Sequence, residues 1–361
     1  MLTNYDDMQE RIRCRSRTWV ITGAAGFIGS HLVETLLILG QTVIGIDNFL
    51  AGSRANLAQV YKTIGEPLWK NFRFIQGDIR SINQCRQICR SASIVLHHAA
   101  VGGRYSIKDP VGANENNATG FLNMLVAAHG AGVTRFIYAV SGDTDSGISA
   151  LPNEQSGTGK QQSLYAVTKY VNELYAETFA RCYGFDSIGV RYFNVFGPRQ
   201  NPDSAYASVV PDWISSMMRN APVHVGGDAG TIRDFCYIDN VVRANLLAAT
   251  VEDVAAVNRI YDIGMGEGIA QSTIFAMLRD MFEREYPHGR VPHPARREIR
   301  CSGAQGSVAD IGMARRLLGY WPMYDVRKGL GLTLAWWAAQ LSAQGAGGGQ
   351  KPGSPAGPQH A

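Results

Sequence analysis

Short apolar runs alternate with longer amphipathic stretches along the first half of this chain. Trp19-Val20-Ile21 and Thr42–Ile46 have the length of buried strands, and Gly26–Leu39 carries apolar residues at helical spacing until Gly40 ends it. Further strands are predicted at 72–75, 93–97, 135–139 and 187–191, with helices ending near 89 and spanning 111–129 and 163–183. Strands that alternate with helices predict a parallel sheet covered by helices on both faces.

The pattern changes after Asn194, where turn-rich stretches separate shorter elements. We therefore predict an N-terminal extension at 1–16, a sheet domain at 17–193 and, mainly, a smaller α/β substrate lobe at 194–340. Residues 341–361 are rich in Gly, Pro, Ser and Gln. They have too few apolar residues to offset the conformational entropy lost on folding, so we predict a disordered tail.

Composition excludes several classes of function. The chain is 45% hydrophobic and 18% charged with a net charge of +4, and basic residues do not gather in a run with aromatic residues, so we expect no nucleic-acid partner. No apolar run reaches membrane-spanning length, so we expect no membrane insertion. The six cysteines match neither a disulfide framework nor a zinc site, which favours a reducing cytoplasm and no metal.

A glycine-rich turn follows the first predicted strand. Gly23 permits a tight turn, Gly26 lets the backbone approach a diphosphate, and Gly29 lets the next helix lie close to the strand. The N–H groups at the start of that helix, at Phe27 and Ile28, then face the phosphates. This strand–turn–helix–strand unit predicts a Rossmann-like doubly wound parallel sheet, an α/β fold, that binds a dinucleotide.

Asp47 ends the second strand, where a carboxylate accepts hydrogen bonds from an adenosine ribose and repels a 2′-phosphate. This position favours NAD over NADP, although the nearby Arg54 offers a charge for a phosphate. Asp78 follows the third strand, where we expect it to contact the adenine edge; a helix N-cap is the structural alternative, and the two roles are compatible. The adjacent Asn48 and Ile79 are included in the predicted cofactor site.

The segment Tyr165-Ala-Val-Thr-Lys169 places a phenol and an ammonium one helical turn apart. A free phenol has a pKa near ~10, and a neighbouring positive charge stabilises the phenolate. Tyr165 is therefore the predicted base, with Lys169 as its cationic partner and a contact for the nicotinamide ribose. Ser141, at the end of the preceding strand, is the predicted third catalytic residue, and Thr144 is a second candidate for that role.

Other polar residues receive structural interpretations. His97 and His98 end a strand, and we interpret them as packing and loop-bonding residues, not metal ligands. Asp234 and Asp239 are interpreted as turn and cap residues. Arg233 and Arg300 are different, because a guanidinium in a turn-rich lobe suits a diphosphate.

With these residues in place, the chain resembles the extended short-chain dehydrogenase/reductase family and, within it, the nucleotide-sugar 4-epimerases, above all the bacterial UDP-N-acetylhexosamine 4-epimerases of surface-polysaccharide pathways. The resemblance rests on the glycine turn, on Tyr165-Ala-Val-Thr-Lys169, on Arg191-Tyr-Phe-Asn-Val-Phe-Gly197 and on Arg233-Asp-Phe-Cys-Tyr-Ile-Asp-Asn240. It implies NAD-dependent C4 epimerisation of a UDP-sugar in the cytoplasm.

The resemblance also implies roles for residues of the lobe. Asn194 would contact the diphosphate and sugar, 209–213, beginning with Val209, would line the uracil site, and Arg233 and Arg300 would bind phosphates. Ser307 falls where a small residue is associated with room for an N-acetylated sugar. The family usually forms dimers through two helices, here 111–129 and 163–183.

Three departures from the family pattern keep alternatives open. Ser141-Gly-Asp-Thr-Asp-Ser-Gly147 keeps only the first serine of a serine-rich strand end, and Arg300-Cys-Ser-Gly303 lacks an expected carboxylate. Arg104-Tyr105-Ser106 resembles the uronic-acid epimerases instead. Two alternatives act on uronates: a UDP-uronate (or UDP-N-acetylhexosaminuronate) 4-epimerase and a uronate decarboxylase. A third is a 4,6-dehydratase, which would need a glutamate that the loop after Ser141 lacks. The fourth is an NAD-binding regulator whose catalysis has decayed.

Overall fold

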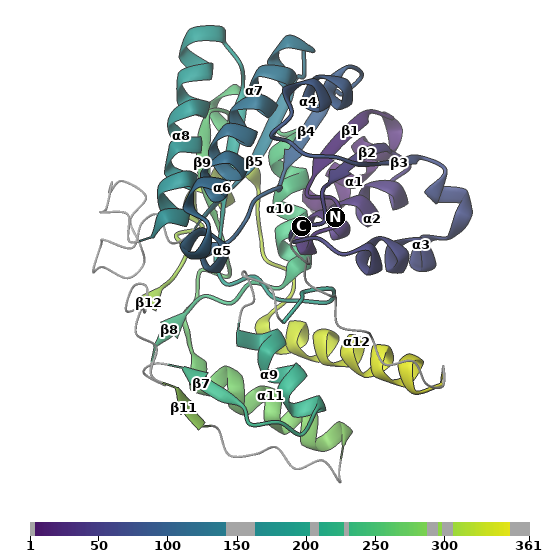
Figure 1. Ribbon diagram of the computed structural model, residues 1–361, viewed down its shortest axis with the longest axis vertical. Helices are drawn as coiled ribbons and strands as arrows, with labels where there is room; N and C mark the ends of the chain where they lie inside the picture. The colour runs from purple at the N-terminus through teal and green to yellow at the C-terminus, as the bar shows by residue number, and fades with distance from the viewer. Residues whose placement is uncertain are drawn as a thin grey trace, which may run out of the picture.

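The computed structural model describes residues 4–141, 163–202, 209–226, 231–286, 295–297 and 306–346. Its centre is a sheet of seven strands in the order β3-β2-β1-β4-β5-β6-β9 (Figure 1). Every neighbouring pair in this sheet is parallel. The strands are β1 (Thr18–Thr22), β2 (Thr42–Asp47), β3 (Phe72–Gln76), β4 (Ile94–His97), β5 (Arg135–Ser141), β6 (Ser187–Tyr192) and β9 (Arg259–Ile263). The order reverses between β1 and β4, which confirms the predicted doubly wound fold.

Helices cover both faces of the sheet. One face carries α2 (Phe27–Ile38), α3 (Arg54–Trp69) and α10 (Ile238–Thr250), and the other carries α4 (Ile82–Cys89), α7 (Gly120–Gly130) and α8 (Leu164–Tyr183). Each face has its own cluster of buried side chains, such as Leu36 and Val241 on one face and Ile88 and Leu125 on the other. Burial of these apolar surfaces is the main source of stability for such a sheet.

The helix predicted over 111–129 is interrupted. The chain forms α5 (Gly103–Lys108) and α6 (Pro110–Asn114), then a π-helical turn at Glu115–Thr119, and only then α7. In this turn Asn117 bonds Val101 through both its carbonyl oxygen (2.8 Å from the backbone N–H) and its amide (2.9 Å from the carbonyl), and the amide also donates to the Thr168 hydroxyl (3.1 Å). The extra residue of the π turn therefore ties the loop after β4 to α8.

The N-terminal extension forms helix α1 (Asn4–Cys14), which packs on α10. Met8 of α1 is fully buried, and the guanidinium of Arg243 lies 3.6 Å from the centre of the Tyr5 ring. The extension is thus part of the folded domain.

The smaller lobe lies below the sheet in Figure 1. It contains α9 (Val209–Met218), β7 (His224–Gly226) paired with β11 (Ala295–Arg297), the three strands β8 (Ile232–Arg233), β10 (Ile269–Ala270) and β12 (Gly306–Ser307), α11 (Gln271–Glu285) and α12 (Val326–Ala346). A short 3-10 turn at Val254–Ala256 packs on a π turn at Ala314–Leu318, which itself packs on α10 and β9 of the sheet domain. The predicted lobe range 194–340 is not strict, because α10 and β9 fall within it but belong to the sheet domain. Helix α12 extends to Ala346, so residues 341–346 of the predicted tail are helical.

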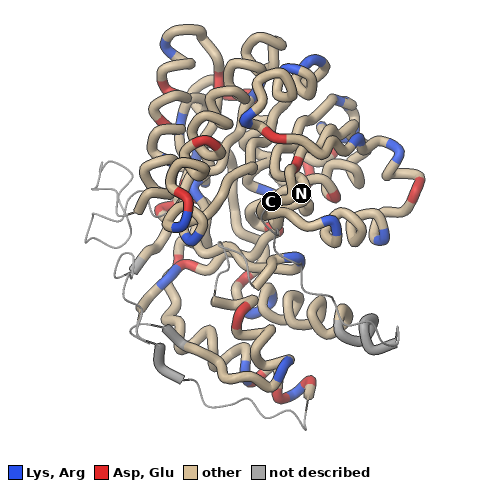
Figure 2. Tube along the Cα trace, viewed as in Figure 1, with Lys and Arg blue, Asp and Glu red and all other residues tan. Residues whose placement is uncertain are grey.

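Charged residues of both signs are mixed along the chain. Figure 2 shows Lys and Arg interspersed with Asp and Glu along the described chain. In the part of the chain that the structure describes, no helix combines the length and the apolar character needed to cross a membrane.

Candidate active site

A cavity of about 1130 Å³ opens between the carboxyl edge of the sheet and the smaller lobe. Its lining combines the glycine turn, the loop after β2, the ends of β5 and β6 and the start of α8 with lobe residues Arg233 and Ser307. Parallel sheets bind ligands at this edge, where their strand order reverses. The volume exceeds that of an ordinary single-ligand pocket, so there is room for a cofactor and a substrate together.

The glycine turn is shaped for close approach. Gly23 has a φ of +70°, and a Cβ there would lie 2.9 Å from the backbone nitrogen of Ala99. A Cβ at Gly29 would overlap the carbonyl oxygen of Gly23, so any larger residue would push α2 away from β1. Gly26 is the N-cap of α2 and offers no capping side chain, which leaves the first N–H groups of the helix for a ligand. The residues predicted to cradle a dinucleotide diphosphate thus form an uncapped helix start at the cavity, with Phe27 and Ile28 in its lining.

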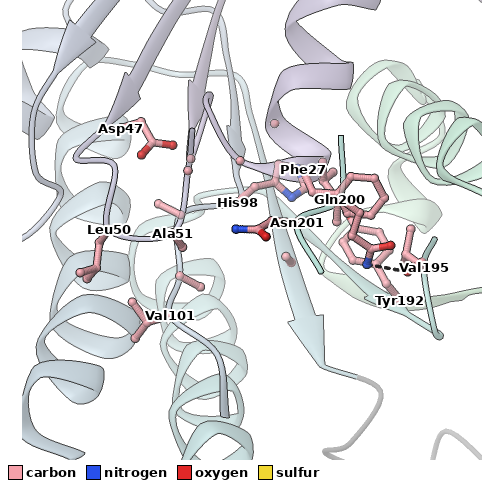
Figure 3. Close-up of a pocket in the computed structure, with 18 of the residues that line it drawn as sticks. Phe27, Asp47, Leu50, Ala51, His98, Val101, Tyr192, Val195, Gln200 and Asn201 are labelled. Atoms are coloured by element: carbon pink, nitrogen blue, oxygen red, sulfur yellow. Dashed lines mark hydrogen bonds between the residues drawn. The ribbon is translucent and has the colours of Figure 1, made fainter. Parts of the chain in front are cut away.

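Asp47 faces the cavity at the end of β2 (Figure 3). Its carboxylate accepts hydrogen bonds from the N–H groups of Ala25 (3.0 Å) and Phe49 (2.7 Å). Burial raises the pKa of this carboxyl, and the two N–H donors oppose that rise. Arg54 is not in the lining: its guanidinium lies 4.4 Å from the centre of the Phe49 ring and donates to Gln76 (2.6 Å). A carboxylate that the nearby Arg54 does not pair with fits a free ribose hydroxyl better than a 2′-phosphate.

Asp78 does not cap α4, and its contact with the adenine stays a prediction. Its carboxylate pairs with Arg80 (2.8 Å) and accepts a hydrogen bond from the Asn48 amide (3.0 Å). Burial alone would raise the pKa of Asp78, but these bonds outweigh burial and lower the pKa. Ser81, not Asp78, is the N-cap of α4. The neighbours Asn48 and Ile79 line the cavity, whereas Asp78 acts beside it by fixing the Asn48 side chain.

Tyr165 and Lys169 lie on the first two turns of α8, which begins after the Ser163 cap. Ser163 accepts from the N–H of Ala166 (3.0 Å), and both catalytic candidates line the cavity. The Lys169 Nζ lies 5.8 Å from the centre of the Tyr165 ring and donates to the carbonyl oxygen of Ala139 (3.2 Å). Burial lowers the pKa of Lys169 to about 8, so the ammonium persists at neutral pH in a site that disfavours it.

Ser141 completes the predicted group. It is the last residue of β5, pairs in register with Tyr192 of β6, is 8% exposed and lines the same cavity as Tyr165 and Lys169. The three predicted catalytic residues therefore line one cavity, as expected for strand ends and a helix start at one sheet edge. Thr144 and the altered stretch at 142–147 lie outside the described residues.

His97 is buried at the end of β4, and the next residue, His98, is half-buried. His97 is hydrogen-bonded to the Thr22 hydroxyl (3.0 Å), and the His98 ring is stacked on Tyr192 with centroids 6.1 Å apart. Burial, followed by the Lys169 charge, lowers the pKa of both, to about 3 for His98. Within the described residues, no group of His, Cys, Asp and Glu is arranged to hold a metal ion.

The lobe supplies three of its predicted residues. Arg233 and Ser307 are register partners on β8 and β12, and both line the cavity together with Asn194. Asn194 donates from its amide to the carbonyl of Asp234 (2.8 Å). The buried Asp234 carboxylate accepts from the N–H groups of Met265 (2.8 Å), Gly266 (2.8 Å) and Ala309 (3.3 Å), and burial raises its pKa to about 6. Asp234 is thus a structural clamp, as predicted, that holds Arg233 in place.

Among the described substrate candidates, Val209 is not one of the residues that line this cavity. Val209 begins α9 and packs against the core, and Trp213 is fully buried with its N–H on the carbonyl of His224 (3.0 Å). Val209 and Trp213 thus pack inside the smaller lobe, and contact of 209–213 with a uracil stays a prediction. Arg300 lies outside the described residues.

Sequence reasoning missed several lining residues. Tyr192, Gln200 and Asn201 face the cavity near Phe27 in Figure 3, and the Gln200 amide donates to the carbonyl of Val195 (3.1 Å). The available signal was their position beside Arg191-Tyr-Phe-Asn-Val-Phe-Gly197. Trp336 and Trp337 of α12 also line the cavity, and no sequence signal placed them there.

Comparison with known proteins agrees with this geometry. The family model "NAD dependent epimerase/dehydratase family" matches residues 19–264. The chain belongs to this family. It is 30% identical to UDP-glucuronate 4-epimerase of Thermodesulfobacterium geofontis over 326 residues, which cover 88% of this chain and 95% of the relative.

Solved structures give the same result. The UDP-glucose 4-epimerase of Thermotoga maritima, solved with UDP-glucose, superposes with a TM-score of 0.80 at 31% identity and covers 90% of this chain and 99% of its own. The UDP-N-acetylglucosamine 4-epimerase of Methanobrevibacter ruminantium M1, in complex with UDP-N-acetylmuramic acid, has a TM-score of 0.80 at 28% identity, with 90% and 99% coverage. This enzyme is therefore NAD-dependent, and the glycine turn with Asp47 fits that cofactor.

Proposed function

We propose that this enzyme inverts C4 of a UDP-N-acetylhexosamine, interconverting UDP-GlcNAc and UDP-GalNAc through a 4-keto sugar. The observation that carries the proposal is the convergence of Ser141, Tyr165 and Lys169 with Arg233 and Ser307 in one cavity beside the glycine turn. A base, a cation and a phosphate-binding guanidinium around one ligand space are the groups this reaction requires.

The protein's own residues divide the work. Bound NAD⁺ supplies a hydride acceptor that returns the hydride to the opposite face of the sugar. Tyr165, as the phenolate, takes the proton of the C4 hydroxyl through or beside the Ser141 hydroxyl, and later gives it back. Lys169 keeps an ammonium near the phenol, and its low-dielectric surroundings strengthen that charge interaction. Arg233 holds the diphosphate, so the sugar can turn about that linkage.

Ser307 favours an N-acetylated sugar as the substrate. Its side chain is small and lies opposite Arg233 in the β8–β12 pair, so the cavity keeps space beside the phosphate-binding position. The segment Arg104-Tyr105-Ser106, which resembles the uronic-acid epimerases, does not argue against an N-acetylated sugar, because of where its residues lie. Arg104 is exposed on α5, and the buried Ser106 hydroxyl donates to the carbonyl of Gly102 (3.1 Å), and neither lines the cavity.

UDP-glucuronate is the second candidate substrate. The observation in its favour is the similarity to a UDP-glucuronate 4-epimerase across nearly the whole length of both chains. A uronate carboxylate would need a cation or several N–H donors near C5. A 4,6-dehydratase would need acid and base groups in 142–147, outside the described residues.

A substrate panel tests the proposal. Purified enzyme with NAD is incubated separately with UDP-GlcNAc, UDP-glucose and UDP-glucuronate, and proton NMR identifies the sugar product. We expect UDP-GalNAc from UDP-GlcNAc at the highest kcat/KM. UDP-galacturonate as the preferred product would transfer the assignment to the second candidate, and a 4-keto-6-deoxy product would replace epimerisation by elimination.

We further propose a cytoplasmic homodimer that serves surface-polysaccharide synthesis. Support for the dimer comes from large apolar side chains exposed on the expected helices, among them Val111 (70% exposed), Val167 (44%) and Leu174 (45%). Sedimentation analysis tests it: the wild type should sediment as a dimer and Val167→Glu as a monomer, and a monomeric wild type would contradict the proposal.

A further inference from the structure

The C-terminal helix α12 reaches the cofactor end of the cavity. Trp336 and Trp337 line the cavity with Asn56 and Gln59 of α3, although about 280 residues separate the two helices (Figure 1 shows α12 running beneath α3). The Gln59 amide donates to the Gln340 side-chain oxygen (3.0 Å). The smaller lobe is thereby fastened to the helix that follows Asp47.

The same helices hold two buried polar atoms without partners. Among the described residues, the Trp337 Nε1 donor and the Gln59 Oε1 acceptor are both buried and have no hydrogen-bond partner. Indole N–H donates only, and the amide oxygen accepts only. Each unpaired atom costs on the order of 1–3 kcal/mol, so a bound group that offers an acceptor to the indole and a donor to the amide would be stabilised at this place.

The adenosine diphosphate half of the cofactor has both kinds of group. Its phosphate oxygens accept and its ribose hydroxyls donate, and α3 is anchored beside the glycine turn because the Asn56 amide and the Ser53 N–H both donate to the carbonyl of Ala25 (3.0 Å each). The two indole rings lie edge to face, 5.4 Å apart, and form a rigid apolar wall at this place.

We propose that Trp336 and Trp337 bind the adenosine diphosphate half of NAD as an outer wall, and that the Gln59–Gln340 bond fastens this wall so that the cofactor stays bound between turnovers. The inference rests on the cofactor of the family and not on the identity of the sugar. It assigns α12 to cofactor binding, a role that the glycine turn and Asp47 alone do not require.

The test measures cofactor release without any substrate. Protein loaded with NADH is mixed with a large excess of NAD⁺, and the decay of bound NADH fluorescence gives the dissociation rate. Trp337→Phe removes only the N–H, Gln340→Ala removes the fastening bond, and Trp336→Ala removes one wall. Trp321→Ala is the matched control, because Trp321 is 60% exposed, lies over Arg315 and is absent from the cavity lining.

We expect Trp337→Phe, Gln340→Ala and Trp336→Ala each to release NADH roughly tenfold faster, the change that a loss of about 1.4 kcal/mol produces. Trp321→Ala should match the wild type. If Trp336→Ala does not fold, the two milder variants carry the test. Release within about twofold of the wild type in folded Trp337→Phe and Gln340→Ala would overturn the proposal.

Discussion

Lys169→Met should stabilise the cofactor-free protein at neutral pH while abolishing most of its activity. Lys169 is 2% exposed, and burial lowers its pKa from 10.5 to about 8. The buried ammonium therefore lowers the stability of the folded protein, although catalysis needs it. Methionine has a similar length and no charge, so the variant removes this destabilisation.

The pKa shift sets the size of the effect. Each pKa unit corresponds to about 1.4 kcal/mol, so the buried ammonium costs about 3 kcal/mol below pH 8. The variant also leaves the Ala139 carbonyl without the Nζ donor, which costs roughly 1 kcal/mol. The net expectation is a gain of about 2 kcal/mol at pH 7.

The sign depends on pH in a defined way. Between about pH 8 and 10.5 the unfolded chain holds the Lys169 proton that the folded chain has released, so wild-type stability rises with pH across this window relative to the variant. Urea unfolding of both proteins at pH 7 and near pH 10 measures the difference. A variant that is less stable at pH 7, or a difference that does not shrink at high pH, would refute the reasoning.

Three further predictions follow from the same geometry. kcat/KM should fall as pH rises through about 8, because Lys169 then loses its charge, and a pH–rate profile that stays flat to pH 10 would contradict this role. Gly29→Ala should weaken NAD binding at least about tenfold by calorimetry, because the new Cβ overlaps the Gly23 carbonyl and displaces α2; wild-type affinity would contradict the close packing. Ser307→Tyr should lower kcat/KM for UDP-GlcNAc roughly 10- to 100-fold and spare UDP-glucose, whereas equal losses would show that Ser307 does not sense the acetamido group.

The sheet domain was predictable because its signals are local. Each strand is a short apolar run, each turn carries a glycine or a polar cap, and the order of the motifs indicated the cofactor. Tyr165, Lys169 and Ser141 converge for the same reason, since strand ends and the next helix start meet at one edge of a parallel sheet.

The misses have physical causes. The helix α3 was not predicted because Gly65, with a φ of +75°, and Pro67 break its pattern. The π turn at 115–119 adds a residue that apolar periodicity does not reveal. Strand β9 joins the sheet, and Gln340 of α12 meets Gln59 of α3, through contacts between distant segments that no local pattern encodes.

The most direct test of the account follows a hydrogen atom. UDP-GlcNAc that carries deuterium at C4 is incubated with the holoenzyme, and NMR with mass spectrometry reads the label in the product. We predict UDP-GalNAc that keeps its deuterium at C4, and no product from Tyr165→Phe, which should still bind NAD. Loss of the label to solvent, or equal turnover by Tyr165→Phe, would contradict transient oxidation at C4 by this site.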